Sequence, residues 1–182
     1  MPVVIEERPL PVREARAGEQ EAWEALLARY RLPLYAYVFE LVHHEQTALD
    51  IVQESFIAAA RHIHSLREDG KFGSWLFNIA HQKCIQHWRR QRPAGFELLD
   101  EDFPEAEPGP EKLLIRKEQE QSFMKALDQL SLPHRAVLLL HFIEEFPLEE
   151  IARITETQLG TVKSRLHYAR RALRKLLEEN ET

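Results

Sequence analysis

The chain has 182 residues, of which 44% are hydrophobic and 30% are charged, and its formal net charge is −6. This size fits one ordinary domain or two small ones, and the apolar content excludes a wholly disordered chain. No run of about 18 apolar residues is present, and the acidic, proline-bearing start lacks the order of a secretory signal. We therefore expect a cytoplasmic protein without membrane insertion, whose single cysteine, Cys84, forms neither an internal disulfide nor a zinc site.

The acidic excess is confined to the middle of the chain. Residues 1–92 hold 12 acidic residues and 12 lysines and arginines, residues 93–122 hold 9 and 3, and residues 123–182 hold 9 and 9. Residues 157–177 contain six lysines and arginines and no acid. A local basic face therefore exists despite the acidic total, so the net charge does not exclude a nucleic-acid partner.

Apolar residues at helical spacing predict four helices in the first half of the chain, over residues 19–30, 34–42, 47–65 and 74–91. The first two are separated near Pro33, because proline lacks a backbone donor and disfavours a helix interior. The apolar stripe predicted for the third helix consists of Leu49, Val52, Phe56 and Ala59. A polar, glycine-bearing loop, residues 66–73, precedes the fourth helix.

Residues 91–110 contain four prolines, two glycines and many acids, a composition that blocks helices and cannot form a core. Four further helices are predicted downstream, over residues 111–130, 134–144, 148–154 and 158–178. The predicted fold is therefore all-α, with two small helical domains. Their expected order is an N-terminal tail (1–16), a first domain (17–92), an acidic flexible linker (93–114) and a second domain (115–178).

The strongest local pattern is a helix-turn-helix over residues 148–171. Pro147 and the two acids that follow Leu148 suit a helix start. On the second helix, one face opposite the apolar stripe gathers basic side chains: Lys163, His167, Arg170, Arg171 and Arg174. A solvated charged face would explain a charge run alone, but this face carries no acid, and Ala152 is small where the two helices cross. A basic second helix is what docking in the DNA major groove requires.

Three segments together resemble one family. Residues 146–152 (FPLEEIA) and 160–170 (GTVKSRLHYAR) are similar to the minus-thirty-five-binding region of extracytoplasmic-function sigma factors, which belong to the sigma-70 family. Residues 48–56 (ALDIVQESF) resemble that family's polymerase-binding helix, and residues 72–80 (FGSWLFNIA) its minus-ten-recognition helix. The order of the segments and the linker between them agree as well. One departure is Glu156, which stands in the turn where glycine is common.

The resemblance implies a transcription initiation factor with no enzymatic activity and no cofactor. Its implied partners are core RNA polymerase, at the clamp of the largest subunit and at the flap region, promoter DNA and an anti-sigma factor. The residues implied to contact polymerase are Asp50, Gln53 and Glu54. Those implied for the minus-ten element are Arg67, Asp69, Lys71, Ser74, Gln82, Lys83, Gln86, Arg89 and Arg90. Those implied for the minus-thirty-five element are Thr161, Lys163, Ser164, Arg165, His167, Tyr168 and Arg171.

Other functional classes find less support in the sequence. The histidine pairs 43/44 and 62/64 point to different helix faces, so neither has the geometry of metal ligands, and no metal site is expected. No phosphate loop or nucleophile elbow is present. Two alternatives remain open: a free-standing helix-turn-helix repressor or activator, which binds duplex DNA without polymerase, and a protein-interaction module with an incidental basic helix.

Overall fold

The computed structural model describes residues 9–91 and 120–180, and these residues form helices and turns without a β-strand. The first half contains α1 (Val12–Arg16), α2 (Gln20–Val42), α3 (Glu45–His62), the short turns η1 (Ile63–Ser65) and η2 (Asp69–Lys71), and α4 (Phe72–Gln91). The second half contains α5 (Glu120–Asp128), α6 (Leu132–Leu138), the π-turn η4 (Leu139–Ile143), α7 (Leu148–Thr155) and α8 (Leu159–Asn180). The all-α class is confirmed, while the predicted linker, residues 93–114, lies outside the described residues.

The predicted break near Pro33 is wrong, because α2 runs without interruption from Gln20 to Val42. A proline inside a helix removes one backbone hydrogen bond and crowds the preceding turn. Leu26 and Leu34, on either side of Pro33, are both fully buried in the same core. Burial of the apolar face therefore outweighs the local cost of the proline, as is usual for helices stabilised by tertiary packing.

The predicted apolar stripe of the third helix is wrong at one position. Val52, Phe56 and Ala59 are buried in α3, but Leu49 remains 43% exposed. Ala48 lies on the buried face of α3 in its place, together with further buried residues about one helical turn apart. The fourth helix, α4, begins at Phe72, two residues earlier than predicted, because Phe72 is fully buried and extends its apolar face.

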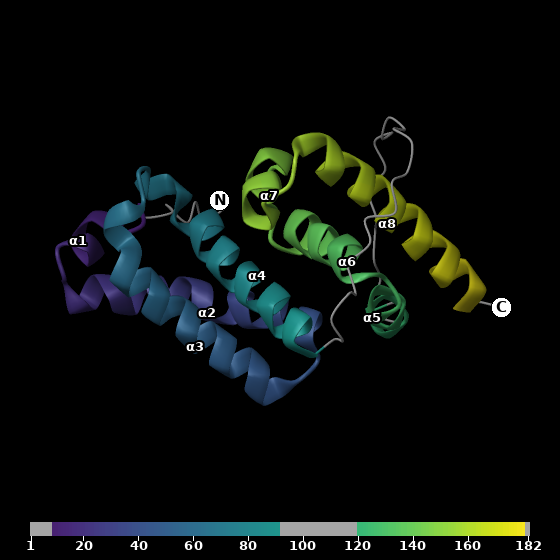
Figure 1. Cartoon of the computed structure of the whole chain (residues 1–182), viewed down its shortest axis with the longest axis horizontal. Helices are drawn as coiled ribbons and strands as arrows, with labels where there is room; N and C mark the ends of the chain where they lie inside the picture. The colour runs from purple at the N-terminus through teal and green to yellow at the C-terminus, as the bar shows by residue number, and fades with distance from the viewer. Residues whose placement is uncertain (1–8, 92–119, 181–182) are drawn as a thin grey trace, which may run out of the picture.

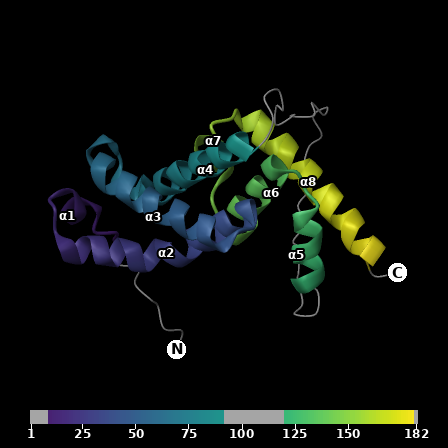
Figure 2. The same ribbon diagram turned by 60° about the horizontal axis from the view of Figure 1, so that its bottom comes forward.

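The first domain is a bundle of α2, α3 and α4, to which α1 adds at one end (Figures 1 and 2). The short helix α1 lies within the predicted N-terminal tail, and its Val12 is fully buried. Trp23 of α2 donates its indole N–H to the carbonyl oxygen of Ala15 at 3.0 Å. Cys84 is buried in the same core and forms no disulfide. The bundle thus holds α4 on one side, with its far face directed at the second half of the chain.

The second domain contains the expected helix-turn-helix. Helix α7 starts after Pro147 and ends at Thr155, and the next residue, Glu156, adopts the left-handed conformation with φ 53° and ψ 41°. A non-glycine residue in this conformation costs about 1–2 kcal/mol. The packed pair of helices offsets that cost, since Ile151 and Ile154 of α7 and Val162 of α8 are all fully buried. The apolar stripe predicted for α8 is buried at Val162, Leu166, Ala169 and Leu173.

Candidate nucleic-acid interface

The outer face of α8 carries the residues expected to read duplex DNA. Lys163 and Arg171 are exposed there, and Thr161, Ser164, His167 and Tyr168 are half-buried. The hydroxyl of Ser164 donates to the carbonyl oxygens of Gly160 and Thr161, both at 3.1 Å. The ring of Tyr168 stacks on His134 of α6, with 6.1 Å between ring centroids. Helix α8 therefore exposes the cations Lys163 and Arg171. The side chains of Ser164 and Tyr168 beside them are held by contacts within the protein.

Arg165 differs from the rest of this set, because its side chain lines a cavity between the two domains. The cavity has a volume of about 270 Å³. Its lining residues from α4 include His81, Gln82 and Arg89, and those from the turn of the helix-turn-helix are Thr155, Glu156 and Thr157. The sequence-predicted residues Arg165, Gln82 and Arg89 are thus brought together at the domain contact, although they were assigned to two different DNA elements.

In the loop before α4, two residues that are predicted to contact DNA, Asp69 and Lys71, form ion pairs within the protein. Asp69 forms an ion pair with Arg16 at 2.7 Å, and Arg16 also donates to the carbonyl oxygen of Leu66. The ammonium of Lys71 pairs with Glu150 of α7. Ser74 is buried and donates its hydroxyl to the carbonyl oxygen of Lys71 at 3.2 Å. Arg67, by contrast, is exposed.

The far half of α4 carries the remaining members of the predicted minus-ten set. Gln86, Arg89 and Arg90 are exposed, and Lys83 forms an ion pair with Glu54 of α3 at 3.1 Å. Trp88 donates its indole N–H to the carbonyl oxygen of Leu41 at 2.8 Å. This bond fixes Trp88 to the C-terminal end of α2.

The exposed face of α3 combines acidic and apolar side chains. Asp50, Gln53 and Glu54 are all exposed, and Asp50 accepts a hydrogen bond from Gln46 at 2.9 Å. Leu49 and Ile57, each 43% exposed, flank these polar groups two helical turns apart. These two side chains add apolar area to a face of α3 that is otherwise polar. The sequence analysis assigned Leu49 to the core and did not single out Ile57.

The comparisons with known proteins decide the family. Residues 26–94 match the family model for Sigma-70 region 2, and residues 120–173 match that for Sigma-70, region 4. The chain belongs to the sigma-70 family. It is 31% identical to the RNA polymerase sigma-H factor of Pseudomonas aeruginosa, with 92% of both chains covered. It is 30% identical to the ECF RNA polymerase sigma factor SigW of Bacillus subtilis, with 98% of this chain and all of that protein covered.

These relatives make the chain a sigma factor of the extracytoplasmic-function type, which directs RNA polymerase to promoters and catalyses no reaction itself. The sigma factor RpoE of Bartonella quintana, solved with the anti-sigma factor NepR, superimposes with a TM-score of 0.67 at 27% identity, covering 87% of this chain and 98% of that one. CnrH, solved with the cytosolic domain of CnrY, gives 0.69 at 23% identity, which shows the shared fold, over 94% and 97% of the two chains. Among the described residues of the sigma factor, no helix is both long and apolar enough to cross a membrane.

A second contact between the domains of this sigma factor centres on Arg135 of α6, which is 7% exposed. Its guanidinium donates to the carbonyl oxygens of Leu127, Asp128 and Leu130 at 2.7–3.1 Å, which closes the turn between α5 and α6. It also donates to the carbonyl oxygen of Glu40 at 2.8 Å and contacts Nε2 of His43. One buried arginine therefore connects the end of α2 with the start of region 4.

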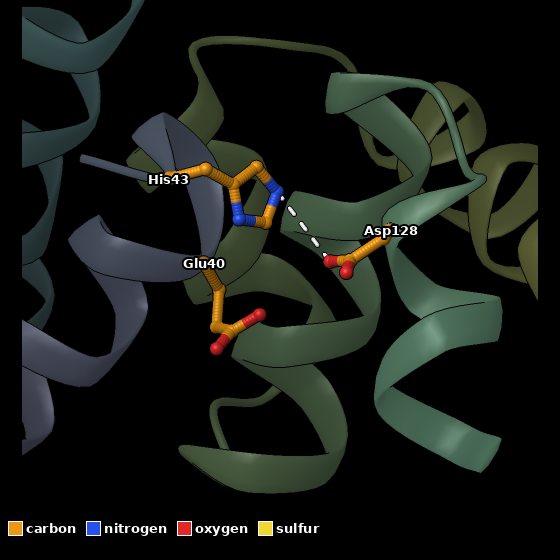
Figure 3. A group of neighbouring side chains, drawn as sticks. All are labelled: Glu40, His43 and Asp128. Carbon is orange, nitrogen blue, oxygen red and sulfur yellow. Dashed lines mark ion pairs between the residues drawn. The ribbon is translucent and has the colours of Figure 1, made fainter. Parts of the chain in front are cut away.

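Glu40, His43 and Asp128 gather beside this arginine, and each offers one ligand atom within 4.8 Å of the others (Figure 3). Imidazole and carboxylate groups at this spacing are possible ligands for a divalent ion. However, His43 directs Nε2 toward Asp128 at 3.4 Å and toward the guanidinium of Arg135. A metal ion there would face the fixed positive charge of Arg135, and burial together with that charge lowers the pKa of His43. The geometry therefore favours a polar contact between the domains that is centred on Arg135.

His81 gives the sigma factor a testable dependence on pH. Its side chain is 5% exposed, and its Nδ1 shares a 2.8 Å hydrogen bond with the hydroxyl of Tyr37. Burial, with a smaller contribution from Arg165, lowers the pKa of His81 to about 4. Below pH 6.5 the unfolded chain gains a proton at this site and the folded chain does not, so stability is complete above pH 6.5 and falls as the pH approaches 4.

This lowered pKa corresponds to a loss of about 3 kcal/mol of unfolding free energy between pH 6.5 and 4. We expect His81→Gln, which can still hydrogen-bond Tyr37, to remove that part of the acid sensitivity. Urea unfolding of both proteins at neutral and acidic pH measures it, since carboxylates that titrate in both proteins cancel in the difference. Equal losses in the two proteins would contradict the assignment.

Proposed function

We propose that three surfaces divide the work of this sigma factor: the exposed face of α3 docks on core polymerase, the loop and α4 engage the minus-ten element, and α8 reads the minus-thirty-five element. The observation that carries the assignment is the helix-turn-helix of α7 and α8, whose second helix exposes Lys163 and Arg171 opposite its buried stripe. We place the domain limits at 17–92 and 115–178, with the linker 93–114 between them.

Within α8, the proposed base readers are Lys163, Ser164 and His167, which lie on the outward face near the start of the helix. Thr161, Tyr168 and Arg171 are proposed to position the helix, the first two through local packing and the last through phosphate contact. Arg165 joins them only when the domains separate, because it lines the cavity between them.

For the minus-ten element, we propose that a base of the non-template strand is turned out of the stack into the loop that precedes α4. Arg67, Asp69, Lys71 and Ser74 would line this site, and Gln82, Lys83, Gln86, Arg89 and Arg90 would follow the neighbouring strand along α4. The ion pair of Asp69 with Arg16 supports the proposal, because a pocket must be rigid to compensate the lost stacking energy.

On α3, the proposed polymerase contacts are Asp50, Gln53 and Glu54, which would meet the clamp region of the largest subunit. The exposed Leu49 and Ile57 support this docking site by adding apolar area around the charges. Region 4 would meet the flap region. A partner that sequesters the factor, of the anti-sigma class with which the similar RpoE was solved, is proposed as well, and the site of action is the cytoplasm, where polymerase works.

Reconstitution with purified core polymerase tests these assignments against the two alternatives. The proposal expects promoter-specific transcription only when polymerase and the sigma factor are combined. A free-standing repressor or activator would bind duplex operator DNA tightly without polymerase. An interaction module would do neither, and either of these results would overturn the proposal.

A further inference from the structure

The cavity of about 270 Å³ lies where α4 of the first domain meets α6 and the helix-turn-helix of the second. Ligand-binding cavities in proteins range from about 300 to 1,000 Å³ and combine apolar walls with a few polar groups. This cavity is near the lower end of that range, so it suits a molecule smaller than a typical drug. Its walls come from both domains and divide into an apolar side and a polar side.

The apolar side consists of Leu132, Pro133 and Ala136 of α6 together with Ile85 of α4. Leu132 and Ala136 belong to the buried core, so the packing of the second domain holds this wall in place. Ile85 and Pro133 are half-buried. Removing such hydrocarbon surface from water is favourable, and an apolar group placed in the cavity would do so. The wall therefore favours a ligand with an apolar body.

The buried part of the polar side is His81 of α4. Within the described residues its hydrogen-bond partner is the hydroxyl of Tyr37, which meets Nδ1 at 2.8 Å. Burial raises the pKa of Tyr37 well above the ordinary value, so the hydroxyl keeps its proton. A buried O–H without an acceptor is costly, so Tyr37 donates to Nδ1. The proton of the neutral imidazole is then on Nε2, the ring nitrogen left for a group in the cavity.

Two arginines add further donors to the polar side. Arg89 of α4 and Arg165 of α8 both line the cavity. Arg165 lies close enough to His81 that its charge contributes, after burial, to the lowered pKa of that imidazole. An imidazole N–H and a guanidinium are both donors, so they cannot hydrogen-bond each other. An oxyanion placed between them can accept from both, and such charge-assisted bonds are the strong ones.

The charge of the lining indicates which oxyanion fits. Among the residues that line the cavity, all of which lie in the described part of the chain, Glu156 is the only acid. Its Oε1 accepts from the amide of Asn78 at 3.2 Å, and Asn78 also donates to the carbonyl oxygen of Ile154 at 3.0 Å. Two arginines and one glutamate leave one positive charge beside the neutral His81. A carboxylate matches that charge, whereas a phosphate monoester carries about −1.5 to −2 at pH 7.

We propose that this cavity binds a small organic monocarboxylate, with the carboxylate between His81 and Arg165 and the apolar body against α6. One carboxylate oxygen accepts from Nε2 of His81, and the guanidinium of Arg165 donates to the other. Arg89 supplies the second positive charge from α4. Because Arg89 and Arg165 belong to different domains, the bound molecule contacts both. The site takes a small molecule and not DNA, so its binding can be measured without polymerase or promoter.

Isothermal titration calorimetry of the full chain with benzoate tests the site. Benzoate joins a carboxylate to one apolar ring, acetate lacks the ring, and benzamide lacks the charge. At constant ionic strength we expect benzoate to bind a single site at least roughly tenfold more tightly than acetate or benzamide. Equal or undetectable binding of all three would overturn the proposal. Tighter binding of phenyl phosphate than of benzoate would overturn the choice of a carboxylate.

A pair of variants tests the role of Arg165. Arg165→Gln removes the charge at the cavity and should weaken benzoate binding roughly tenfold. The matched control is Arg171→Gln, which makes the same change of charge at an exposed position of α8 outside the cavity lining and should leave the affinity unchanged. Equal losses in the two variants would indicate a general effect of charge and overturn the site. Circular dichroism verifies that both variants keep their helicity.

Two further measurements test the location. Ile85→Trp enlarges a half-buried wall residue and should abolish benzoate binding by filling part of the cavity. In the parent, benzoate should shift the backbone amide resonances of Gln82 and Thr157, which line the cavity from different domains. Shifts confined to residues away from the cavity would overturn the assignment, and so would full affinity in a folded Ile85→Trp. If Ile85→Trp does not fold, Arg165→Gln and the amide shifts decide the question.

Discussion

Reversing two charges on α3, with Asp50→Arg and Glu54→Arg, should abolish association with core polymerase. Both side chains are exposed, and like charges facing each other across an interface cost several kcal/mol, which corresponds to a loss of at least about a hundredfold in affinity. The fold should tolerate the change. Within the first domain, Glu54 loses its pair with Lys83, and an exposed pair of this kind contributes only about 0–1 kcal/mol.

The matched control for that experiment reverses Glu21 and Glu24, two exposed acids on α2, and so makes the same change in net charge away from α3. Co-purification with core polymerase and far-ultraviolet circular dichroism measure binding and helicity in parallel. If the α3 variant co-purifies as well as the parent, the docking role of Asp50 and Glu54 is wrong. Equal losses in both variants would indicate a general effect of charge.

Replacing residues 67–71 with a glycine-serine segment of equal length should block promoter opening while leaving polymerase binding and minus-thirty-five contacts intact. The segment contains Asp69, which the ion pair with Arg16 holds in place, and Lys71. Extruding a base costs a few kcal/mol, so loss of the pocket should slow opening by roughly a hundredfold. Permanganate reactivity of exposed thymines on an intact duplex promoter measures this step directly.

Two controls make the loop experiment specific. Glu150→Gln removes the charge that pairs with Lys71 but keeps the loop sequence, so it should open the promoter at least as fast as the parent. A promoter that is melted in advance at the minus-ten element should restore transcription to the loop variant at least partly. If the variant opens intact duplex as fast as the parent, α4 performs the opening without the loop.

The helical class and most elements could be predicted from the sequence, because apolar periodicity reports which face each helix buries. The exceptions have local causes. Pro33 predicts a helix break because proline lacks a backbone donor. Helix α2 nevertheless continues through it, since Leu34 is fully buried in the core. Leu49 fits the apolar period of α3, but Ala48 and Val52 lie on the buried face beside it and Leu49 stays 43% exposed.

The candidate site could be predicted as a set of residues but not as an arrangement. A pattern within one helix carries no information on which face of another domain will cover it. Lys71 and Glu150 are 79 positions apart in the chain and each looks like an ordinary surface charge. Asn78 could not be predicted as a contact residue, because a single amide on a helix forms no pattern in the sequence. Its role follows only from the fold, which places the end of α7 against it.

The burial of Cys84 bears on which signals this sigma factor can sense by itself. Its environment raises the pKa of the thiol to about 12, chiefly through burial. At neutral pH only about one molecule in 10⁵ then carries the thiolate, which is the form that oxidants attack. Cys84 is the sole cysteine of the chain and is held as a buried thiol, so it is a poor target for direct oxidation in the folded protein.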